Sequence, residues 1–248
     1  MIFDFVTRER SLKSECVVSV LGSFGFSVGC KPRRALPHGS QRLLAFLALR
    51  DRAVTRTAIA GTLWPEASEE HAHASLRSAL SRLNEIERTV VRVTFQDLSL
   101  ADGVSIDIRD ARLLTHRLLN PGTGRDSDLS DQAIATLSVD LLPDWYDEWA
   151  VVEAEDWRQL RLHALDALAE RLTAAGRYAD ATSAALAAVK AEPLRETAHA
   201  ALVRVYLAEG NRAEALSAFE HYRALLRAEL DLEPTPLIQA LVKDLQQP

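Results

Sequence analysis

Apolar residues change their spacing along the first third of the chain. Valine, phenylalanine and serine with glycine breaks begin at residue 16, which predicts short antiparallel strands up to about residue 36. Leucines then recur three and four residues apart, which predicts a helix over 40–51 with Ser40 as its N-cap. A second helix is expected over 55–65, because Ile59 and Leu63 are four residues apart and Pro65 follows. The region therefore begins as a small sheet and continues as helices.

A third helix is predicted over 68–86, and strand-like alternation returns after it. Residues 89–108 predict a hairpin that turns near Gln96 and Asp97, followed by a short strand at 104–108. Strands, three helices and a hairpin in this order are the plan of a winged helix. In that plan the third helix enters the major groove of DNA, and the hairpin touches the adjacent backbone or minor groove.

The two faces of the third helix differ in chemistry. At 100° per residue, one face is an apolar stripe made of Ala72, Leu76, Ala79, Leu80 and Leu83. The other face carries Ala74, Arg77, Ser78, Ser81, Arg82 and Glu85. Small residues permit close approach, serine hydroxyls can meet phosphates or base edges, and arginines can bind phosphate or guanine. We therefore expect DNA contacts from this face, with an ordinary solvated surface as the alternative.

A repeat of 34 residues organises the second half of the chain. The stretch "GRYADATSA" (176–184) aligns with "GNRAEALSA" (210–218), and this separation is the tetratricopeptide period. Glycine ends the first helix of each unit, where a positive φ is needed, and alanines let the paired helices approach closely. The expected helix pairs are 160–176 with 178–193 and 196–210 with 212–230, and a short helix at 236–245 is expected to cap the stack.

These patterns predict a mainly α protein with a small β component. An N-terminal winged helix-turn-helix is followed by an α-helical domain of tetratricopeptide-like repeats. The stretch "NPGTGRDSD" (120–128) is the most linker-like part of the chain. The expected parts are an extension at 1–15, a winged-helix domain at 16–115, a linker at 116–130 and a helical domain of tetratricopeptide-like repeats at 131–248.

Composition and charge support two separate tasks. The 248 residues, 48% of them hydrophobic, can bury one large core or two modest ones. Residues 1–115 carry 16 lysines and arginines against 13 acidic residues, whereas residues 116–248 carry 13 against 22. An anionic partner such as nucleic acid therefore suits the first half better than the second.

Other segments predict neither export nor a redox role. The apolar run from Ile2 to Val6 is too short for a signal peptide or a membrane span, so a cytoplasmic protein without membrane contact is expected. Cys16 and Cys30 are too few for a disulfide framework and are expected to be structural thiols.

Sequence motifs favour neither metal binding nor catalysis. In "EEHAH" (69–73), His71 and His73 are about 200° apart on a helix and cannot share an ion. Glu69 and Glu70 instead suit the first turn of a helix. No nucleophile motif, zinc motif or phosphate-binding glycine loop occurs, so we expect no catalytic, metal-binding or cofactor-binding residues.

Three of the four tryptophans, Trp145, Trp149 and Trp157, lie within thirteen residues upstream of the repeats. They could form an exposed binding surface. Burial of tryptophan is so favourable, however, that we expect them to anchor the entering helix on the repeats.

Taken together, the chain resembles the SARP family of bacterial antibiotic-pathway regulators, which join an OmpR-type winged helix to a bacterial transcriptional activator domain. In the first half the matching run is "QRLLAFLALRDRAVTRTAIAGTLWPEASEEHAHASLRSALSRL" (41–83). In the second half the matching stretches are "LLPDWYDEW", "RQLRLHALDALAERLTAAGRYADA", "EPLRETAHAALVRVYLAEGNRAEAL" and "ELDLEPTPLI". The resemblance covers about residues 17–245.

This resemblance implies a sequence-specific activator that binds promoter direct repeats in double-stranded DNA. It also implies that the helical domain supports self-association on DNA and contacts RNA polymerase, in control of a secondary-metabolite pathway. By position, the recognition-helix contacts would be Arg77, Ser78, Ser81 and Arg82, joined by Ala74 from the helix pattern. The wing would lie at 94–97, with Thr94 and Gln96 as its contacts.

The chain also departs from the family pattern. Where relatives tend to carry an aromatic residue and further arginines late in the recognition helix, this chain has Ser81, Asn84 and Glu85, and the wing carries the acidic Asp97. The alternative hypothesis is therefore a tetratricopeptide-type interaction scaffold, or a regulator whose DNA binding is weakened or lost. Its concave repeat surface would bind a peptide or helix, and its acidic half would favour a basic one.

Overall fold

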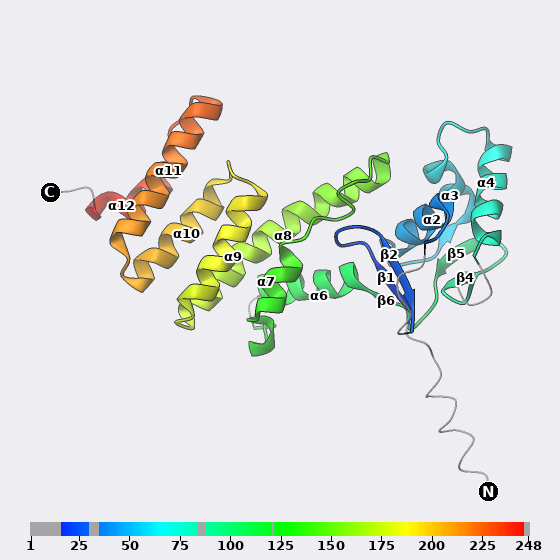
Figure 1. The fold of residues 1–248 in the computed structure, drawn as a ribbon, viewed down its shortest axis with the longest axis horizontal. Coiled ribbons are helices and arrows are strands. Elements are labelled where there is room, and N and C mark those ends of the chain that lie inside the picture. Colours follow the sequence, from blue (N-terminus) through cyan, green and yellow to red (C-terminus); the bar gives the residue numbers. More distant parts are fainter. Residues whose placement is uncertain (1–15, 30–34, 84–87, 121, 246–248) are drawn as a thin grey trace, which may run out of the picture. The chain divides into compact units, whose positions relative to one another are not determined.

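A computed structural model describes residues 16–29, 35–83, 88–120 and 122–245 (Figure 1). The chain forms two compact units. The first comprises Met1–Asp110 and Asp140–Glu155, and the second comprises Ala111–Val139 and Asp156–Pro248. The first unit therefore includes a segment from the middle of the chain, and the domain boundaries expected from sequence stay predictions.

One small sheet of the first unit joins residues from both ends of the winged-helix region. β1 (Cys16–Ser19) pairs antiparallel with β2 (Gly25–Val28) and parallel with β6 (Ser105–Ile106). The antiparallel strands and the late short strand were both expected from sequence. Burial raises the pKa of the Cys16 thiol, whereas Cys30 lies outside the described residues.

A second small sheet contains the predicted hairpin. β4 (Val91–Val93) and β5 (Asp97–Leu100) pair antiparallel, and β3 (Val54–Thr55) adds a third strand on the other edge of β5. The hairpin and its turn near Gln96 are confirmed. β3 was not predicted, because a strand of two residues is too short to show a period.

Three helices of the first unit follow the predicted order: α2 (His38–Ala48), α3 (Arg56–Leu63) and α4 (Glu69–Ser81) (Figure 1). Thr55 caps α3 by accepting a hydrogen bond from the amide of Ala58 at 3.3 Å. Ser68 caps α4 by accepting one from the amide of His71 at 3.4 Å. These caps satisfy amides that have no partner within their own helix.

The predicted Ser40 cap is wrong. α2 begins two residues earlier, after Pro37, and its start has no side-chain cap. Ser40 is instead fully buried, and its Oγ donates a hydrogen bond to the carbonyl of Ala79 on α4 at 2.8 Å. A serine before a helical pattern resembles a cap locally, but a partner 39 residues away determines its role here.

The tryptophan cluster divides between the two units. Trp149 packs edge-on against Phe46 of α2, with ring centroids 5.5 Å apart, and Trp145 lies 6.0 Å from Phe24. These two tryptophans therefore anchor the middle segment within the first unit rather than on the repeats, which corrects the expectation. Trp157 is buried in the second unit, where its Nε1 donates to the carbonyl of Val139 at 2.9 Å.

The second unit is helical. Its elements are the latter part of α6 (Asp107–Leu119), η1 (Asp126–Asp128), α7 (Asp131–Leu137), α8 (Glu148–Ala174) from residue 156, α9 (Tyr178–Ala191), α10 (Glu196–Glu209), α11 (Arg212–Leu230), α12 (Pro236–Val242) and η2 (Lys243–Leu245). Residues 116–119 continue α6, so the stretch expected as a linker begins inside a helix.

The predicted repeat is confirmed. Gly176 and Gly210 have φ values of 71° and 88°, the left-handed conformation that ends a helix. Ala181 and Ala215 are fully buried at equivalent positions, where the paired helices approach. α10 packs on both α9 and α11, and α12 contacts α10 and α11 at the end of the stack (Figure 1).

Candidate nucleic-acid interface

α4 separates a buried face from an exposed face, as its sequence predicts. Ala72, Leu76, Ala79 and Leu83 are each at most 3% exposed, and Leu80 is half-buried beside them. The buried stripe rests on α2 and α3, and the bond from Ser40 to the α4 backbone fixes the helix further. α4 is thus presented by a packed support rather than by a loop.

All five helix residues predicted to contact DNA are exposed. Ala74, Arg77, Ser78 and Ser81 lie on α4, and Arg82 is its C-cap residue. The Oγ of Ser81 donates to the carbonyl of Ser78 at 2.9 Å, so its proton is used within the helix while its oxygen can still accept. Asn84 and Glu85 lie outside the described residues.

The hairpin beside α4 ends in a tight and well-supported turn. The amide of Thr94 donates to the carbonyl of Asp97 at 2.9 Å, and the Oγ1 of Thr94 accepts from the Asp97 amide at 2.9 Å. The Arg56 amide donates to the carbonyl of Gln96 at 2.8 Å, and its Nη2 donates to the carbonyl of Thr94 at 3.3 Å. The N-terminus of α3 therefore holds the tip of the hairpin.

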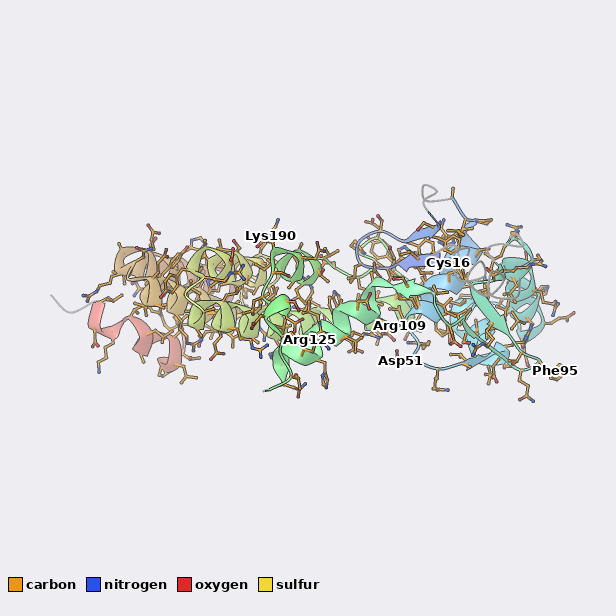
Figure 2. All side chains as sticks on the ribbon, turned by 90° about the horizontal axis from the view of Figure 1, so that it is seen from below. Cys16, Asp51, Phe95, Arg109, Arg125 and Lys190 are labelled. Atoms are coloured by element: carbon orange, nitrogen blue, oxygen red, sulfur yellow. The ribbon has the colours of Figure 1, made fainter. Side chains whose placement is uncertain are left out.

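These bonds change which tip residues can reach a ligand. The Thr94 hydroxyl closes the turn, so the freest side chains at the tip are Phe95 and Gln96, both exposed. Phe95 is 94% exposed and stands at the outer end of the hairpin (Figure 2). Sequence reasoning missed Phe95, because the alternation of a strand does not carry through a turn and gives no orientation there.

A hollow between α4 and β4 connects the helix to the hairpin. Its volume is about 310 Å³, and it is lined by Arg77, Leu80, Ser81, Leu83, Arg88, Val91 and Val93. Arg88, which was not predicted as a contact, donates from Nη2 to the carbonyl of Ser81 at 3.3 Å. The fold thus brings the predicted Arg77 and Ser81 next to a further exposed arginine and to the strand that leads to the wing tip.

Histidines and acids near the start of α4 make local contacts. The Nδ1 of His71 lies 2.7 Å from the Oγ of Ser68, and the Nε2 of His73 lies 4.0 Å from Glu69. Within 16–29, 35–83, 88–120 and 122–245, no group of three or more His, Cys, Asp or Glu side chains is arranged to hold a metal ion. Over the same residues, none of the helices is both long and apolar enough to cross a bilayer.

The repeats contain a separate hollow of about 680 Å³ between α8 and α10. Asp166, Glu170 and Arg204 are its charged lining residues, among alanines, threonines and Val205. Thr197 donates to Asp166 at 3.0 Å, and burial is the largest influence on this carboxyl, raising its pKa. This hollow is where the interaction-scaffold hypothesis would place a ligand.

Comparison with known proteins agrees with the two-part architecture. The model of the bacterial transcriptional activator domain matches residues 116–246. The regulatory protein AfsR of Streptomyces coelicolor is 29% identical over 211 residues, which are 80% of this chain and 21% of AfsR. AfsR of Streptomyces griseus is also 29% identical, over 89% of this chain and 23% of its own length. The chain therefore spans about a fifth of the length of these relatives.

A solved structure shares the fold. Mycobacterium tuberculosis EmbR, in complex with a low-affinity phosphopeptide, aligns with 94% of this chain and 66% of its own, at a TM-score of 0.66 and 22% identity. The matched domain defines a class of transcription regulators rather than a class of enzymes. With more than half of its length matched, this chain belongs to the bacterial transcriptional activator domain family, in the arrangement of SARP-type regulators.

Proposed function

We propose that the chain is a sequence-specific DNA-binding regulator of transcription. α4 enters the major groove, and the β4–β5 hairpin contacts the neighbouring minor groove or backbone. The observation that carries this proposal is the exposed face of α4, small, hydroxylated and basic, adjoining an arginine-lined hollow beside the hairpin. Arg77 and Arg82 bind phosphate or guanine, while Ala74 and Ser78 allow the helix to approach the base edges.

The regulator acts as an activator at promoter direct repeats in this proposal. Two copies occupy adjacent half-sites about one helical turn apart, and the helical domain contacts RNA polymerase. The matched activator domain and the regulatory AfsR relatives support a role in the regulation of transcription. Control of a secondary-metabolite pathway is part of the proposal because the sequence resembles SARP regulators. The exposed wing residue Gln96 adds a polar contact outside the major groove.

Replacement of Arg82 by alanine tests the site. Arg82→Ala should weaken binding to a duplex selected by the full chain from a random library by about 1 to 3 kcal/mol, without unfolding the first unit. Arg212→Ala is the matched control, because Arg212 is an equally charged, exposed residue on α11 of the second unit. Fluorescence anisotropy gives the affinities. Equal affinities for Arg82→Ala and the parent chain would show that Arg82 does not contact the DNA.

The second candidate function is an interaction scaffold, which the hollow between α8 and α10 favours. Asp166 pairs with Arg195 at 3.6 Å, so Glu170 is the lining carboxylate that would bind a peptide with a cationic side chain. If the library yields no selected sequence and DNA binding is uniform, this candidate replaces the first. Titration with a lysine-rich peptide then compares the affinity of the parent with that of Glu170→Gln, and so tests whether the peptide binds in the hollow.

A further inference from the structure

The tip of the β4–β5 hairpin exposes an aromatic ring that no part of the fold uses. Phe95 is 94% exposed, the largest exposed fraction among the large hydrophobic side chains of the described residues. Val93, which precedes it at the end of β4, is 51% exposed. Both side chains lie on the same hairpin. Exposed apolar groups do not stabilise the fold, so their exposure indicates a function in binding another molecule.

The backbone beneath this ring is held in place. Hydrogen bonds between Thr94 and Asp97 close the turn on one side, and Arg56 binds the carbonyls of Thr94 and Gln96 from α3. The ring is therefore presented on a pre-organised tip, so little conformational entropy is lost when it binds. Figure 2 shows Phe95 projecting from the end of the hairpin.

The surroundings of Phe95 favour nucleic acid over a protein partner. A protein interface would extend the apolar surface, but here Phe95 is followed by the polar Gln96. On the other side of Val93, the next exposed residue of β4 is Arg92, which pairs with Asp102. Val93 also lines the hollow that holds Arg77 and Arg88, so the strand leads from the basic helix face to the tip. Arginines can bind the phosphates on either side of a groove into which a ring is inserted.

We propose that Phe95 inserts as a wedge at a base step in the minor groove next to the site of α4, and kinks the duplex there. This inference rests on the proposed DNA-binding function and deepens it. Proteins that use phenylalanine in this way partly unstack one base step and bend the DNA. Because pyrimidine–purine steps unstack most easily, the tip selects a TA or CA/TG step without hydrogen bonding to its bases. The regulator therefore reads part of its operator through deformability.

The test uses the full chain and a duplex selected by it from a random library. 2-Aminopurine replaces each adenine in turn, and its fluorescence rises where a base loses its stacking. The parent should raise the fluorescence at one step next to the major-groove site. Phe95→Ala should abolish this rise, reduce the bend seen by end-to-end energy transfer and weaken binding about tenfold, since one base–aromatic contact is lost. The dependence of affinity on salt should not change, because no phosphate contact is removed.

Two variants serve as controls. Phe95→Leu keeps an apolar wedge and should retain part of the bend. Tyr146→Ala removes an aromatic side chain of the first unit that is 86% exposed but lies outside the hairpin, and it should match the parent. Thermal unfolding should be the same for all four proteins, since neither ring is buried.

Each other outcome has a distinct meaning. If the parent and Phe95→Ala give the same fluorescence, bend and affinity while Arg82→Ala still weakens binding, the wedge is refuted and the DNA-binding function stands. If the parent selects no sequence, both proposals fail. If Phe95→Ala lowers activation in a transcription assay but leaves the bend intact, the tip contacts protein, and the wedge is refuted.

Discussion

At the scale of single residues, the role of a polar side chain depends on partners that are distant in the sequence. His199 is 2% exposed, its ring stacks on Tyr222 with centroids 4.3 Å apart, and its Nε2 donates to the carbonyl of Pro193 at 2.8 Å. The helical pattern around His199 does not show whether its ring is exposed or buried, because the stacking partner Tyr222 lies on another helix. The role of Ser40 was likewise not predictable from its neighbours, because its hydrogen-bond acceptor, the carbonyl of Ala79, belongs to another helix.

A pH dependence follows from the burial of His199. Burial lowers the pKa of His199 and outweighs the hydrogen bond to the Pro193 carbonyl, which raises it; the nearby His221 charge lowers it further. The unfolded chain therefore binds this proton at a higher pH than the folded chain does. The stability contributed by neutral His199 is therefore complete above pH 6.5 or so and is lost as pH falls through the folded pKa. The slope from this group reaches at most about 1.4 kcal/mol per pH unit.

Urea unfolding of the parent and of His199→Phe between pH 7.5 and 5 measures this effect. The phenylalanine variant keeps a ring beside Tyr222 but cannot titrate, so its free energy of unfolding should change less over this range. The account of His199 is wrong if both proteins lose stability equally as pH falls.

At the scale of elements, patterns among neighbouring residues predicted helices, strands and repeats correctly, whereas features that depend on residues distant in the sequence were missed. The start of α4 near Ser68, its apolar stripe, the β4–β5 hairpin and the 34-residue repeat were all predicted from neighbouring residues. β3 was missed because two residues show no period and because its partner β5 lies more than forty residues away in the sequence. For the site, the pattern predicted the exposed helix face correctly. It did not identify Arg88 or Phe95, because both follow the end of α4 and the helical periodicity gives no orientation for them.

The glycine that ends α10 offers a test of the repeat geometry. Gly210 has a φ of 88°, and a Cβ added there would meet no atom within 4 Å. Gly210→Ala should therefore destabilise the second unit through backbone strain alone, by about 1 to 2 kcal/mol. Gly61 on α3 is the control, because its Cβ would also meet nothing but its position is helical.

Gly61→Ala should accordingly stabilise the first unit by about 0.5 to 1 kcal/mol. Urea unfolding followed by circular dichroism at 222 nm compares both variants with the parent. An unchanged midpoint for Gly210→Ala would show that the left-handed turn between the repeat helices is not required.

At the scale of the whole molecule, the division of charge along the sequence does not coincide with the division of structure. The first unit includes the acidic segment 140–155, so it carries 15 lysines and arginines against 19 acidic residues, and the second unit carries 14 against 16. The net charge of the first unit therefore does not attract DNA by itself, and binding requires that its arginines gather on one face. The arrangement of Arg77, Arg82 and Arg88 about α4 meets that condition.

Footprinting of the full chain on the intergenic DNA upstream of its own gene tests the central claim most directly. The titration is made at two salt concentrations, with unrelated DNA as competitor. We expect protection of two half-sites about one helical turn apart, at concentrations that rise with salt as counterions compete for the phosphates. Protection no stronger than on the competitor, at either salt concentration, would contradict selective binding at its own promoter.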